Sequence, residues 1–422
     1  MKKIVLILLI SVPLVAQIAN MNLNKIYFGQ PISTVTARSM ALGGAGLAGG
    51  NAFLAGTHNP ALAINSDGMI SINGGSRLYN LEEDRAFPYV DNFGGFVDFG
   101  SYYYQNNWYG SFYGQIVYAP DMIDFMNLHI STGFVPFMDF DYDYFEEVRS
   151  PGFGDELIAY NIIENGGQLS AIPINIAVQP IEGLSVGLGV SFLVGDVNYS
   201  ERIVSKSTSF KGDSLINVDN TLDGMPNIIT AGVSYQIDER LTVGSSYRFP
   251  YTVKTDVSLA TNTLKGKTSN EAKYPARIGA GVDYRFENIL AAQIMVDYYY
   301  EFWSDFENDL FANSFDDTYN LRVGVEHIFF DNVPFRAGLS FGTLREDKSL
   351  TQTTFTLGTG FVFKNVRADI AFGYSNNQYF QKDLFSDDLY GISIRNEELD
   401  ADTDRVSWTQ VFGRIDFSYS FE

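Results

Sequence analysis

Three histidines, His58, His129 and His327, are the residues of this chain best suited to acid–base chemistry. A Ser–His–Asp hydrolase needs one of them beside a nucleophile, and a zinc protease needs two of them in an HExxH motif. The sequence has no HExxH motif and no close histidine pair, and His327 lies on the apolar register of a predicted strand. We therefore predict no catalytic residues and a structural role for the histidines. A hydrolase is the minor alternative.

A glycine motif at residues 44–49 reads G-A-G-L-A-G and matches the GxGxxG pattern of dinucleotide-binding loops. Such a site needs the motif after a strand and at the start of a helix, with an acidic residue about 20 positions later. Asp67 stands near that spacing, but no hydrophobic strand precedes Gly44 and no βαβ pattern follows. We interpret the stretch, with Gly43, Gly44 and Gly46, as a flexible small-residue segment and predict no cofactor.

Asp139, Asp141 and Asp143 alternate with aromatic residues, as at the start of a calcium loop. An EF-hand loop also needs Gly at its sixth position and Glu at its twelfth. Tyr144 and Ser150 occupy those positions here. We predict a solvated acidic loop and no metal site, with weak calcium bridging as the alternative.

A set of charged residues lies on predicted strands, on the register opposite the apolar side chains. These residues are Arg77, Arg248, Arg285, Arg322, Arg336, Asp283, Asp297, Glu326 and Asp369. In a membrane barrel a charge is tolerated on the side that faces the lumen and is costly on the side that faces lipid. We therefore expect these residues to face a lumen. Mutual pairing that holds the wall is the preferred role of each, and a contribution to a substrate path is the alternative.

The strands that would position these charges are recognised by alternation. In Leu184–Val194 (LSVGLGVSFLV) the even positions are apolar and the odd positions are mostly Ser and Gly. This period of two recurs in segments of about ten residues, which is typical of strands that cross a bilayer at a tilt. A soluble β-sandwich is the alternative, but its strands are usually about five or six residues long.

The candidate strands and the connections between them predict the size of a barrel. The strands are 69–79, 94–104, 108–118, 169–179, 184–197, 225–237, 241–257, 275–286, 290–303, 319–330, 334–344, 354–363, 366–376 and 406–421, with a weaker one at 128–137. Short connections such as 105–107 and 180–183 alternate with long ones such as 198–224 and 258–274, as periplasmic turns and extracellular loops do. Leaving out 128–137 preserves this alternation. The fold prediction is therefore an all-β, transmembrane antiparallel barrel of fourteen strands with both ends periplasmic, and a hidden strand within 138–168 would make sixteen.

The composition agrees with a membrane barrel and excludes other classes of protein. The chain has 15% aromatic residues, only 18% charged residues and a mean hydropathy of −0.04. No mature segment approaches the roughly 18 apolar residues of a transmembrane helix. The formal net charge of −22 argues against nucleic-acid binding, which needs a basic surface. The chain has no Cys, and therefore no disulfide and no thiolate metal site.

The chain divides into three predicted parts. Residues 1–16 read as a signal peptide, because Lys2 and Lys3 precede a short apolar run and Ala16 is a suitable cleavage point. Residues 17–68 show no clean alternation and are too polar to cross a bilayer, which suits an N-terminal plug folded inside a pore. Residues 69–422 form the barrel with its long extracellular loops. The predicted location is the outer membrane of a Gram-negative-type bacterium.

Several segments resemble one family of outer-membrane transporters. Residues 37–64 contain a small-residue stretch that leads into Asn59-Pro60-Ala61, and they resemble the N-terminal plug of the FadL/TodX family. Three further segments, 241–254, 274–286 and 319–342, resemble consecutive parts of the barrel of that family. The similarity keeps its order over most of the mature chain, although residues 80–168 do not match the family well.

The resemblance implies a fourteen-stranded barrel that is plugged by its N-terminal segment, with Asn59, Pro60 and Ala61 at the structural hinge. It also implies passive uptake of hydrophobic small molecules, such as long-chain fatty acids or aromatic hydrocarbons. The ligand would enter a largely apolar lumen pocket, the plug would shift, and the ligand would leave sideways through a break in the wall. A dry pocket with an exit into lipid suits an apolar solute better than a watery pore does.

A second group of plugged barrels is similar in the same region. PorV-like proteins of the type IX secretion system also carry a lead-in to an Asn-Pro motif. The alternative function is therefore a protein-binding component of a type IX-like secretion or surface-attachment system, with a protein partner at the extracellular loops. Both functions predict outer-membrane lipid as a partner, and neither predicts nucleic acid.

Overall fold

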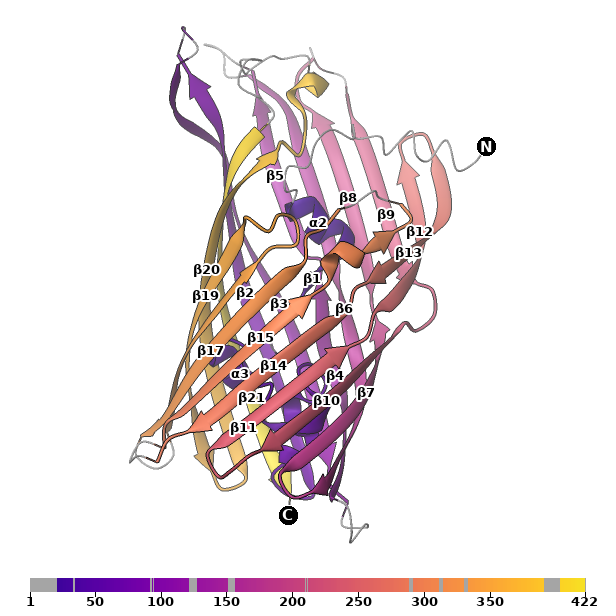
Figure 1. Ribbon diagram of the computed structural model, residues 1–422. Helices are drawn as coiled ribbons and strands as arrows, with labels where there is room; N and C mark the ends of the chain where they lie inside the picture. Colours follow the sequence, from indigo (N-terminus) through magenta and orange to yellow (C-terminus); the bar gives the residue numbers. More distant parts are fainter. Residues whose placement is uncertain are drawn as a thin grey trace.

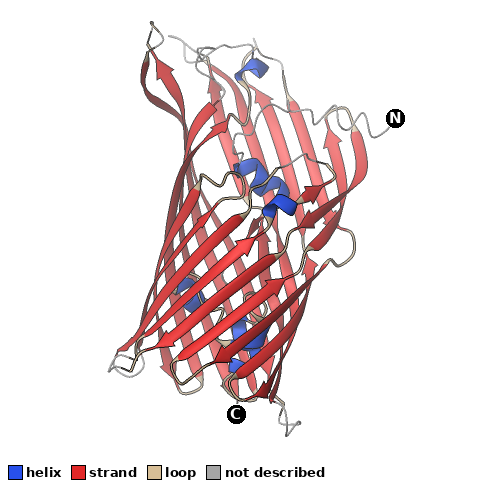
Figure 2. Cartoon of the chain, viewed as in Figure 1, coloured by secondary structure: helices blue, strands red, loops and turns tan. Residues whose placement is uncertain are grey.

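The computed structural model describes residues 21–32, 35–91, 93, 95–120, 127–150, 156–208, 210, 212–287, 291–310, 314–329, 333–390 and 403–421. Figures 1 and 2 show a tall antiparallel β-barrel with short helices in its interior. Within the described ranges, no helix is long and apolar enough to cross a membrane. The predicted signal peptide, residues 1–16, lies outside the described residues.

Fourteen strands, several of them in two segments, form a closed barrel. In chain order they are β2 (Ile70–Val90), β3 (Phe96–Tyr118), β4 (Asn127–Asp139) with β5 (Tyr142–Arg149), β6 (Leu157–Ile181), β7 (Leu184–Val194) with β8 (Asp196–Ser205), β9 (Ser214–Leu222) with β10 (Asn227–Gln236), β11 (Leu241–Arg248) with β12 (Tyr251–Thr261), β13 (Lys265–Tyr274) with β14 (Arg277–Arg285), β15 (Gln293–Glu301), β17 (Thr318–Phe329), β18 (Val333–Thr343), β19 (Thr351–Phe363), β20 (Val366–Lys382) and β21 (Thr403–Phe421). The last strand, β21, pairs with the first, β2, and this pairing closes the barrel. The predicted fold class and strand number are confirmed, and the alternative of sixteen strands is wrong.

The alternation in β7 has the orientation that the sequence predicts. Val186 and Leu188 point outward and are 37% and 55% exposed, whereas Ser185 on the same strand is buried. β7 pairs with β6 on one side and β10 on the other. Outward side chains elsewhere are also large and apolar, such as Phe355 on β19 and Phe417 on β21, which are 58% and 55% exposed. An apolar outer face around a small or polar inner face is the architecture of outer-membrane barrels. This architecture agrees with the predicted location.

The first strands differ from the prediction in two ways that cancel in the count. The two candidates 94–104 and 108–118 are one continuous strand, β3, so the turn expected at 105–107 does not exist. The Gln-Asn-Asn sequence there resembles a turn because it is polar, but Asn106 and Asn107 bond to Asn80 on the paired strand β2.

The weak candidate 128–137, left out of the predicted barrel, is a true strand, β4. It pairs with β3 on one side and β6 on the other. Its alternation is lost after Phe134, because inward side chains near its end are apolar as well and the register shifts between Pro136 and Met138. Val135 and Met138 lie in a core cluster with Phe28 of the N-terminal region.

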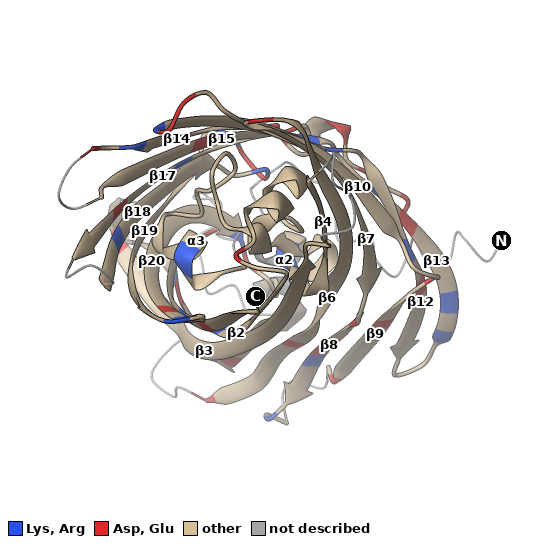
Figure 3. Cartoon of the chain, turned by 90° about the horizontal axis from the view of Figure 1, so that it is seen from below, with Lys and Arg blue, Asp and Glu red and all other residues tan. Residues whose placement is uncertain are grey.

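The barrel has one end with short turns and one end with long hairpins, which lie at the bottom and the top of Figure 1. Much of the predicted long loops 198–224 and 258–274 is folded as β8, β9 and β13, which extend the wall at the long-hairpin end. Pairing in hairpins satisfies backbone groups that a loop would leave to water. Figure 3 shows that β8, β9, β12 and β13 splay away from the central ring. The short elements η3 (Trp303–Asp305), β16 (Glu307–Asn308) and η4 (Asp387–Tyr390) follow strands at this end.

Residues 21–68, of which 33 and 34 are not described, are called the N-terminal segment and lie inside the ring of strands (Figure 3). The segment contains α2 (Met21–Phe28), β1 (Gln30–Pro31), α3 (Ala37–Ala41) and the 3-10 helices η1 (Ala52–Leu54) and η2 (Pro60–Asn65). α3 begins where the Thr36 hydroxyl accepts a bond from the Ser39 N–H, and η2 begins where the Asn59 side chain accepts one from the Ala61 N–H. Both are N-caps that satisfy a free helix donor.

Candidate functional site

The small-residue stretch of the N-terminal segment packs against glycines of the wall. An added Cβ at Gly338 of β18 would overlap the Gly43 nitrogen, and one at Gly244 of β11 would lie 2.8 Å from Ala48 Cα. Gly43, Gly44 and Gly46 themselves have φ angles of 69°, 84° and 139°, which side chains rarely adopt. The stretch is therefore a closely packed chain of tight turns that follows the inner wall. It shows no helix opening at the GxGxxG motif, as a nucleotide loop would.

Side chains of the wall bind the backbone of this stretch. The Asp297 carboxylate of β15 accepts bonds from the N–H groups of Gly46 and Leu47, at 2.8 and 2.9 Å. The Ser234 hydroxyl of β10 donates to the Ala48 carbonyl at 2.7 Å. A turn folded without regular secondary structure leaves many backbone groups unpaired, and these inward side chains satisfy them. The predicted lumen charge Asp297 is thus a ligand of the N-terminal segment.

The motif Asn59-Pro60-Ala61 fastens the end of the segment to the wall. The Asn59 side chain is fully buried, donates to the carbonyls of Leu47 and Val233 at 3.0 Å each, and accepts from the Ala61 N–H at 3.0 Å. It therefore joins two parts of the segment to β10. Wall glycines make the room, because an added Cβ at Gly187 would overlap Ala61 and Pro60.

Replacing Asn59 by Ala is expected to lower the free energy of unfolding by about 1–3 kcal/mol, because it removes the amide that donates to the carbonyls of Leu47 and Val233 and accepts from the Ala61 N–H. Urea unfolding in lipid vesicles, followed by tryptophan fluorescence, measures this change. Asn65 is the matched control, since it is exposed and its side chain makes one bond, to Gly50. An Asn59→Ala variant as stable as Asn65→Ala would show that the motif does not anchor the segment.

A buried network of charges also joins the segment to the wall. Arg38 of α3 donates to Glu326 of β17 at 2.8 Å and to Gln293 of β15 at 3.2 Å. Glu326 also pairs with Arg336 of β18, which in turn bonds to Asp369 of β20 at 2.8 Å. Arg336 is fully buried. Four strands and α3 are therefore held together by one alternating chain of positive and negative side chains.

The other predicted lumen charges have different neighbours. Arg322 donates to the Gly44 carbonyl at 3.1 Å and Arg248 lies 3.6 Å from Glu301. Asp283 accepts from Gln293 at 2.6 Å. Arg285 is exposed at the end of β14, next to a short turn. Structural pairing thus accounts for the predicted charges named here except Arg285.

The backbone ladder of the wall is interrupted between β3 and β4. The two strands pair only over 114–118 of β3 and 130–134 of β4. Beyond this point, towards the long-hairpin end, the described residues of β3 pair with β2 alone and those of β5 pair with β6 alone. We call this line, between 105–113 of β3 and 135–145 of β4 and β5, the seam.

Side chains, and not the backbone ladder, hold the two sides of the seam together. Asn107 donates to the Asp143 carbonyl at 3.2 Å, and the Asp143 N–H donates to the Tyr109 hydroxyl at 3.0 Å. Gln105 accepts from the Phe145 N–H at 2.9 Å. Such bonds exchange more readily than a continuous ladder, because each depends on a side-chain rotamer.

The N-terminal segment covers part of the seam from inside. In β1, Gln30 and Pro31 pair with Asp139 and Met138 of β4. The other edge of β4 at these residues is taken by β6. β1 therefore occupies the edge of β4 that β3 leaves free.

Several solved barrel structures share the fold of this chain. A FadL homologue of Pseudomonas aeruginosa matches with a TM-score of 0.66 and 14% identity, over 93% of this chain and 100% of that chain. The toluene transporters TbuX of Ralstonia pickettii and TodX of Pseudomonas putida match with TM-scores of 0.60 and 0.61, each at 15% identity over 92% of this chain and 99% of theirs. The chain has the FadL/TodX fold. No protein-family model matches the sequence, and neither does any curated protein.

The FadL-like barrel contains a cavity of about 260 Å³ between the N-terminal segment and the long-hairpin end. Aromatic side chains line part of it, among them Tyr299, Trp303 and Trp408. Charged side chains, among them Glu301 and Arg345, line the rest. The expectation of a largely apolar lumen pocket is therefore wrong for this cavity. The charges that line it come from α2, β15, β17 and the connection after β18. The sequence does not reveal that these elements approach one another.

The histidines of the FadL-like barrel have structural contacts. His58 donates from Nε2 to the Gly44 carbonyl at 3.0 Å, while Nδ1 accepts from Thr57 at 2.9 Å. Burial, with the charges of Arg322 and Arg277, lowers the pKa of His58 to about 3, so the ring is neutral at physiological pH. His327 faces outward beside Phe329.

The third histidine has a neighbour that sequence reasoning missed. His129 lies 3.0 Å from the Ser66 hydroxyl and 3.2 Å from Asn127. An amide cannot stabilise an imidazolium as the carboxylate of a hydrolase triad does. The contact therefore ties the end of the N-terminal segment to β4.

The acidic run at 139–143 is used internally. Asp139 pairs with Lys25 at 3.5 Å, and Asp141 accepts from the Gly167 N–H at 3.0 Å. Over the described part of the chain, no group of three or more His, Asp or Glu side chains is arranged to hold a metal ion. The carboxylates close the bend between β4 and β5.

Several arginines that join the N-terminal segment to the barrel were not among the predicted charges, and Arg38 and Arg345 are two of them. Arg38 is the link between α3 and the wall, and Arg345 donates to the Gly29 carbonyl at 2.8 Å while it stacks on Trp303. Arg345 lies in a connection, where alternation gives no register. Arg38 lies beside the small-residue stretch. A lone charge among small residues was the sequence signal that could have identified it.

Proposed function

We propose that this chain is an outer-membrane channel for the passive uptake of hydrophobic small molecules. A solute enters the lumen at the long-hairpin end, the N-terminal segment moves as a plug, and the solute leaves sideways through the seam into lipid. Long-chain fatty acids and aromatic hydrocarbons are the proposed solutes. The fold shared with a FadL homologue, with toluene transporters and with the monoaromatic hydrocarbon channel CymD supports this proposal.

The seam is the observation that carries the proposal. A lateral exit needs a place where strands separate without loss of backbone hydrogen bonds, since each unsatisfied group in lipid costs several kcal/mol. At the seam this ladder is already interrupted. Its outer surface is aromatic, with Trp108 and Phe112 62% and 71% exposed, which suits the passage of an apolar molecule into lipid. β1, which belongs to the N-terminal segment, lies on the inner side of the seam. Movement of that segment would therefore expose the seam to the lumen.

Crosslinking the seam tests the proposal. The chain has no Cys, so Asn107→Cys with Asp143→Cys introduces the only thiols. Joining them with a short, reducible bis-thiol reagent is expected to abolish the uptake of labelled toluene by a channel-deficient Gram-negative host, because the strands can no longer part. Reduction is expected to restore uptake. The measurement is the initial rate of uptake before crosslinking, after it and after reduction.

A matched pair controls for the crosslink itself. Leu321 and Phe341 lie directly opposite each other in the intact ladder of β17 and β18. Crosslinked cysteines at these positions are expected to leave uptake unchanged. Uptake that continues through a crosslinked seam contradicts the lateral exit, and a wild-type chain without toluene uptake contradicts the channel.

The alternative function, a protein-binding component of a type IX-like secretion or surface-attachment system, stays a prediction. The contacts described above do not depend on a protein partner at the long hairpins.

A further inference from the structure

The hairpin of β2 and β3 projects from the long-hairpin end of the barrel, at the top left of Figure 1. Trp108 of β3 is exposed on the outer face, as residues of the aromatic girdle of a membrane barrel are. Phe96 lies twelve residues closer to the tip, which is roughly 40 Å along an extended strand. The tip of the hairpin therefore stands in water, clear of the bilayer.

Large apolar side chains near this tip are exposed. Tyr89, Phe96 and Val97 are more than half exposed, and Phe93 in the turn between the strands is almost wholly exposed. On an outer-membrane barrel such side chains normally face lipid. Gathered on a part of the protein that stands in water, they indicate a surface that binds a partner.

The outer edge of β3 near the tip has no strand beside it. Over residues 96–101, β2 is the one strand that pairs with β3 in the described part of the chain. The strand that follows across the seam, β5, pairs with β6 alone among the described residues. An unpaired edge presents a row of backbone N–H and C=O groups, and these are a template for another strand.

The two edges of the hairpin differ in their protection. Beyond Ala86 the described pairing of β2 with β21 ends, and Pro88 in that part of β2 has no N–H to offer another strand. In contrast, β3 contains no Pro, Lys or Arg from 96 to 118. Pro and Lys are the residues that usually protect an exposed edge. The edge of β3 is therefore the one that can accept a strand.

Two bulges restrict the kind of strand that fits this edge. The register between β2 and β3 shifts at Arg85/Ala86 and again at Tyr89/Val90. Bulges increase the local twist of a strand. A flexible peptide follows such a twist, whereas the flat edge of a preformed sheet does not. The geometry thus favours an extended segment of polypeptide as the occupant.

A second copy of this chain does not fit the edge. Two copies in one membrane are related by a two-fold axis along the membrane normal. The upper part of the hairpin runs more nearly along this direction than across it (Figure 2). Rotation about such an axis keeps an upright strand upright, so it cannot place the strand antiparallel to its own copy. Pairing would also bring the exposed Asp91 and Asp98 of both hairpins together.

The charge of the hairpin favours a basic partner. Asp91 and Asp98 are exposed, and residues 86–118 contain no Lys or Arg that could neutralise them. Arg405 of β21 lies over the Phe99 ring at the base of the exposed surface and offsets part of this charge. Carboxylates beside an apolar surface attract a partner of positive charge and repel an acidic one.

We propose that residues 96–101 of β3 bind an extended, basic segment of another polypeptide by strand addition. Backbone hydrogen bonds along the edge supply the affinity, and the neighbouring aromatic side chains and carboxylates select a segment in which apolar and basic residues alternate.

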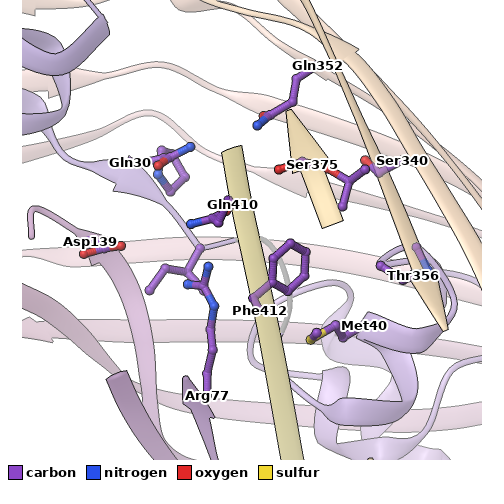
Figure 4. A pocket seen from close by; sticks show the side chains of 14 residues that line it. Gln30, Met40, Arg77, Asp139, Ser340, Gln352, Thr356, Ser375, Gln410 and Phe412 are labelled. Carbon is purple, nitrogen blue, oxygen red and sulfur yellow. Dashed lines mark hydrogen bonds between the residues drawn. The ribbon is translucent and has the colours of Figure 1, made fainter. Parts of the chain in front are cut away.

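This docking edge lies apart from the interior of the channel. None of the residues described for β3 lines the cavity of about 260 Å³. None lines the smaller cavity of about 120 Å³ either, which contains Arg77 and Gln410 and is shown in Figure 4. The inference therefore does not rest on the proposed function.

Binding of a synthetic peptide to the purified full chain in phosphatidylcholine nanodiscs tests the proposal. The probe is a short fluorescent peptide in which Lys and Thr on one face alternate with Val on the other. We expect it to bind at least about tenfold more tightly than a peptide with Glu in place of Lys, and than one with Pro in place of some of the Val residues. The Glu peptide tests the charge. The Pro peptide tests the backbone ladder, because Pro has no N–H.

Asp98→Lys is expected to remove the preference for the Lys peptide over the Glu peptide, because it reverses the charge at the edge. Asp219→Lys is the matched control. Asp219 is exposed as well, but it lies on β9, which pairs with β8 on one side and β12 on the other. This control is expected to bind the peptides as the wild type does. Heat-dependent gel migration checks that both variants are folded.

Hydrogen exchange of the backbone locates the bound peptide. We expect a saturating amount of the Lys peptide to slow exchange at residues 96–101 by at least about tenfold and to leave β9 unchanged. No binding, a control peptide that binds as tightly as the Lys peptide, or binding that leaves exchange at 96–101 unchanged overturns the proposal.

Other occupants give different results. Exchange at 96–101 that slows as the concentration of protein rises, without peptide, assigns the edge to a second copy and overturns the proposal. Slowing by lipopolysaccharide, with no effect of the peptide, assigns it to lipid or polysaccharide and overturns it as well. Toluene uptake is expected to be the same in wild type and Asp98→Lys, so failure of the channel would appear there independently of peptide binding.

Discussion

Replacing Glu326 by Gln is expected to lower the free energy of unfolding by about 3–5 kcal/mol, the usual cost of breaking a buried ion pair. Glu326 lies between Arg38 and Arg336, and its substitution leaves two buried guanidinium groups with one carboxylate fewer. Gln has the same shape as Glu, so the change removes charge and leaves the packing intact. Asp369 remains as the partner of Arg336, whereas Arg38 retains the Gln293 side chain.

The contact that we expect the substitution to weaken most is the one between α3 and the wall. Urea unfolding in lipid vesicles measures the free energy, and the matched control is Glu287→Gln. Glu287 pairs with Arg240 at the short-turn end, where both side chains are exposed, and we expect no measurable change there. Equal stability of the two variants would mean that the buried network does not hold the segment in place.

Replacing Gly338 by Ala is expected to displace the small-residue stretch while the barrel itself stays folded. The added Cβ would overlap backbone atoms of Leu42 and Gly43, which cannot rotate away as a side chain can. Overpacking of this kind typically costs about 1–3 kcal/mol. The N-terminal segment is the element free to relieve it, because β18 is fixed by pairing with β17 and β19.

Labelling of a single thiol measures this displacement. The Ala45→Cys substitution introduces a single thiol into a chain without Cys, at a position that is 1% exposed. We expect slow reaction with a hydrophilic maleimide in the parent, and a reaction at least about tenfold faster with Gly338→Ala, which corresponds to about 1.4 kcal/mol. Gly166→Ala is the control, since an added Cβ there meets no atom within 4 Å. Unchanged labelling in Gly338→Ala, with the barrel folded, would show that the stretch tolerates the overlap.

The alternation that predicts the barrel also places the inner charges correctly. Glu326 and Arg336 face the interior because neighbouring positions on their strands, such as Leu321 and Phe335, belong to the register that faces lipid. Their pairing with each other follows from register, since β17 and β18 place them directly opposite. Their link to Arg38 is beyond sequence reasoning, because 288 positions separate Arg38 from Glu326.

The same reasoning fails at β4 for a physical reason. It assumes that one face of each strand meets lipid and the other meets a polar lumen. Val135 and Met138 near the end of β4 instead meet the apolar side of the N-terminal segment, so the period of two is lost in this part of the strand. The failure marks the strand beside the seam, where the proposed exit lies.

The sequence by itself determined that the chain is an antiparallel membrane barrel, because a strand between lipid and lumen must alternate and this alternation is local. Its count of fourteen strands was right because the division of β3 into two strands and the omission of β4 cancel. It also determined that the small-residue stretch and Asn59 lie outside the alternating strands of the barrel. The tertiary structure alone decided where the ladder between β3 and β4 is interrupted and which charges meet the N-terminal segment. These features depend on the stagger of strands around a closed ring and on contacts between residues hundreds of positions apart, which no local pattern contains.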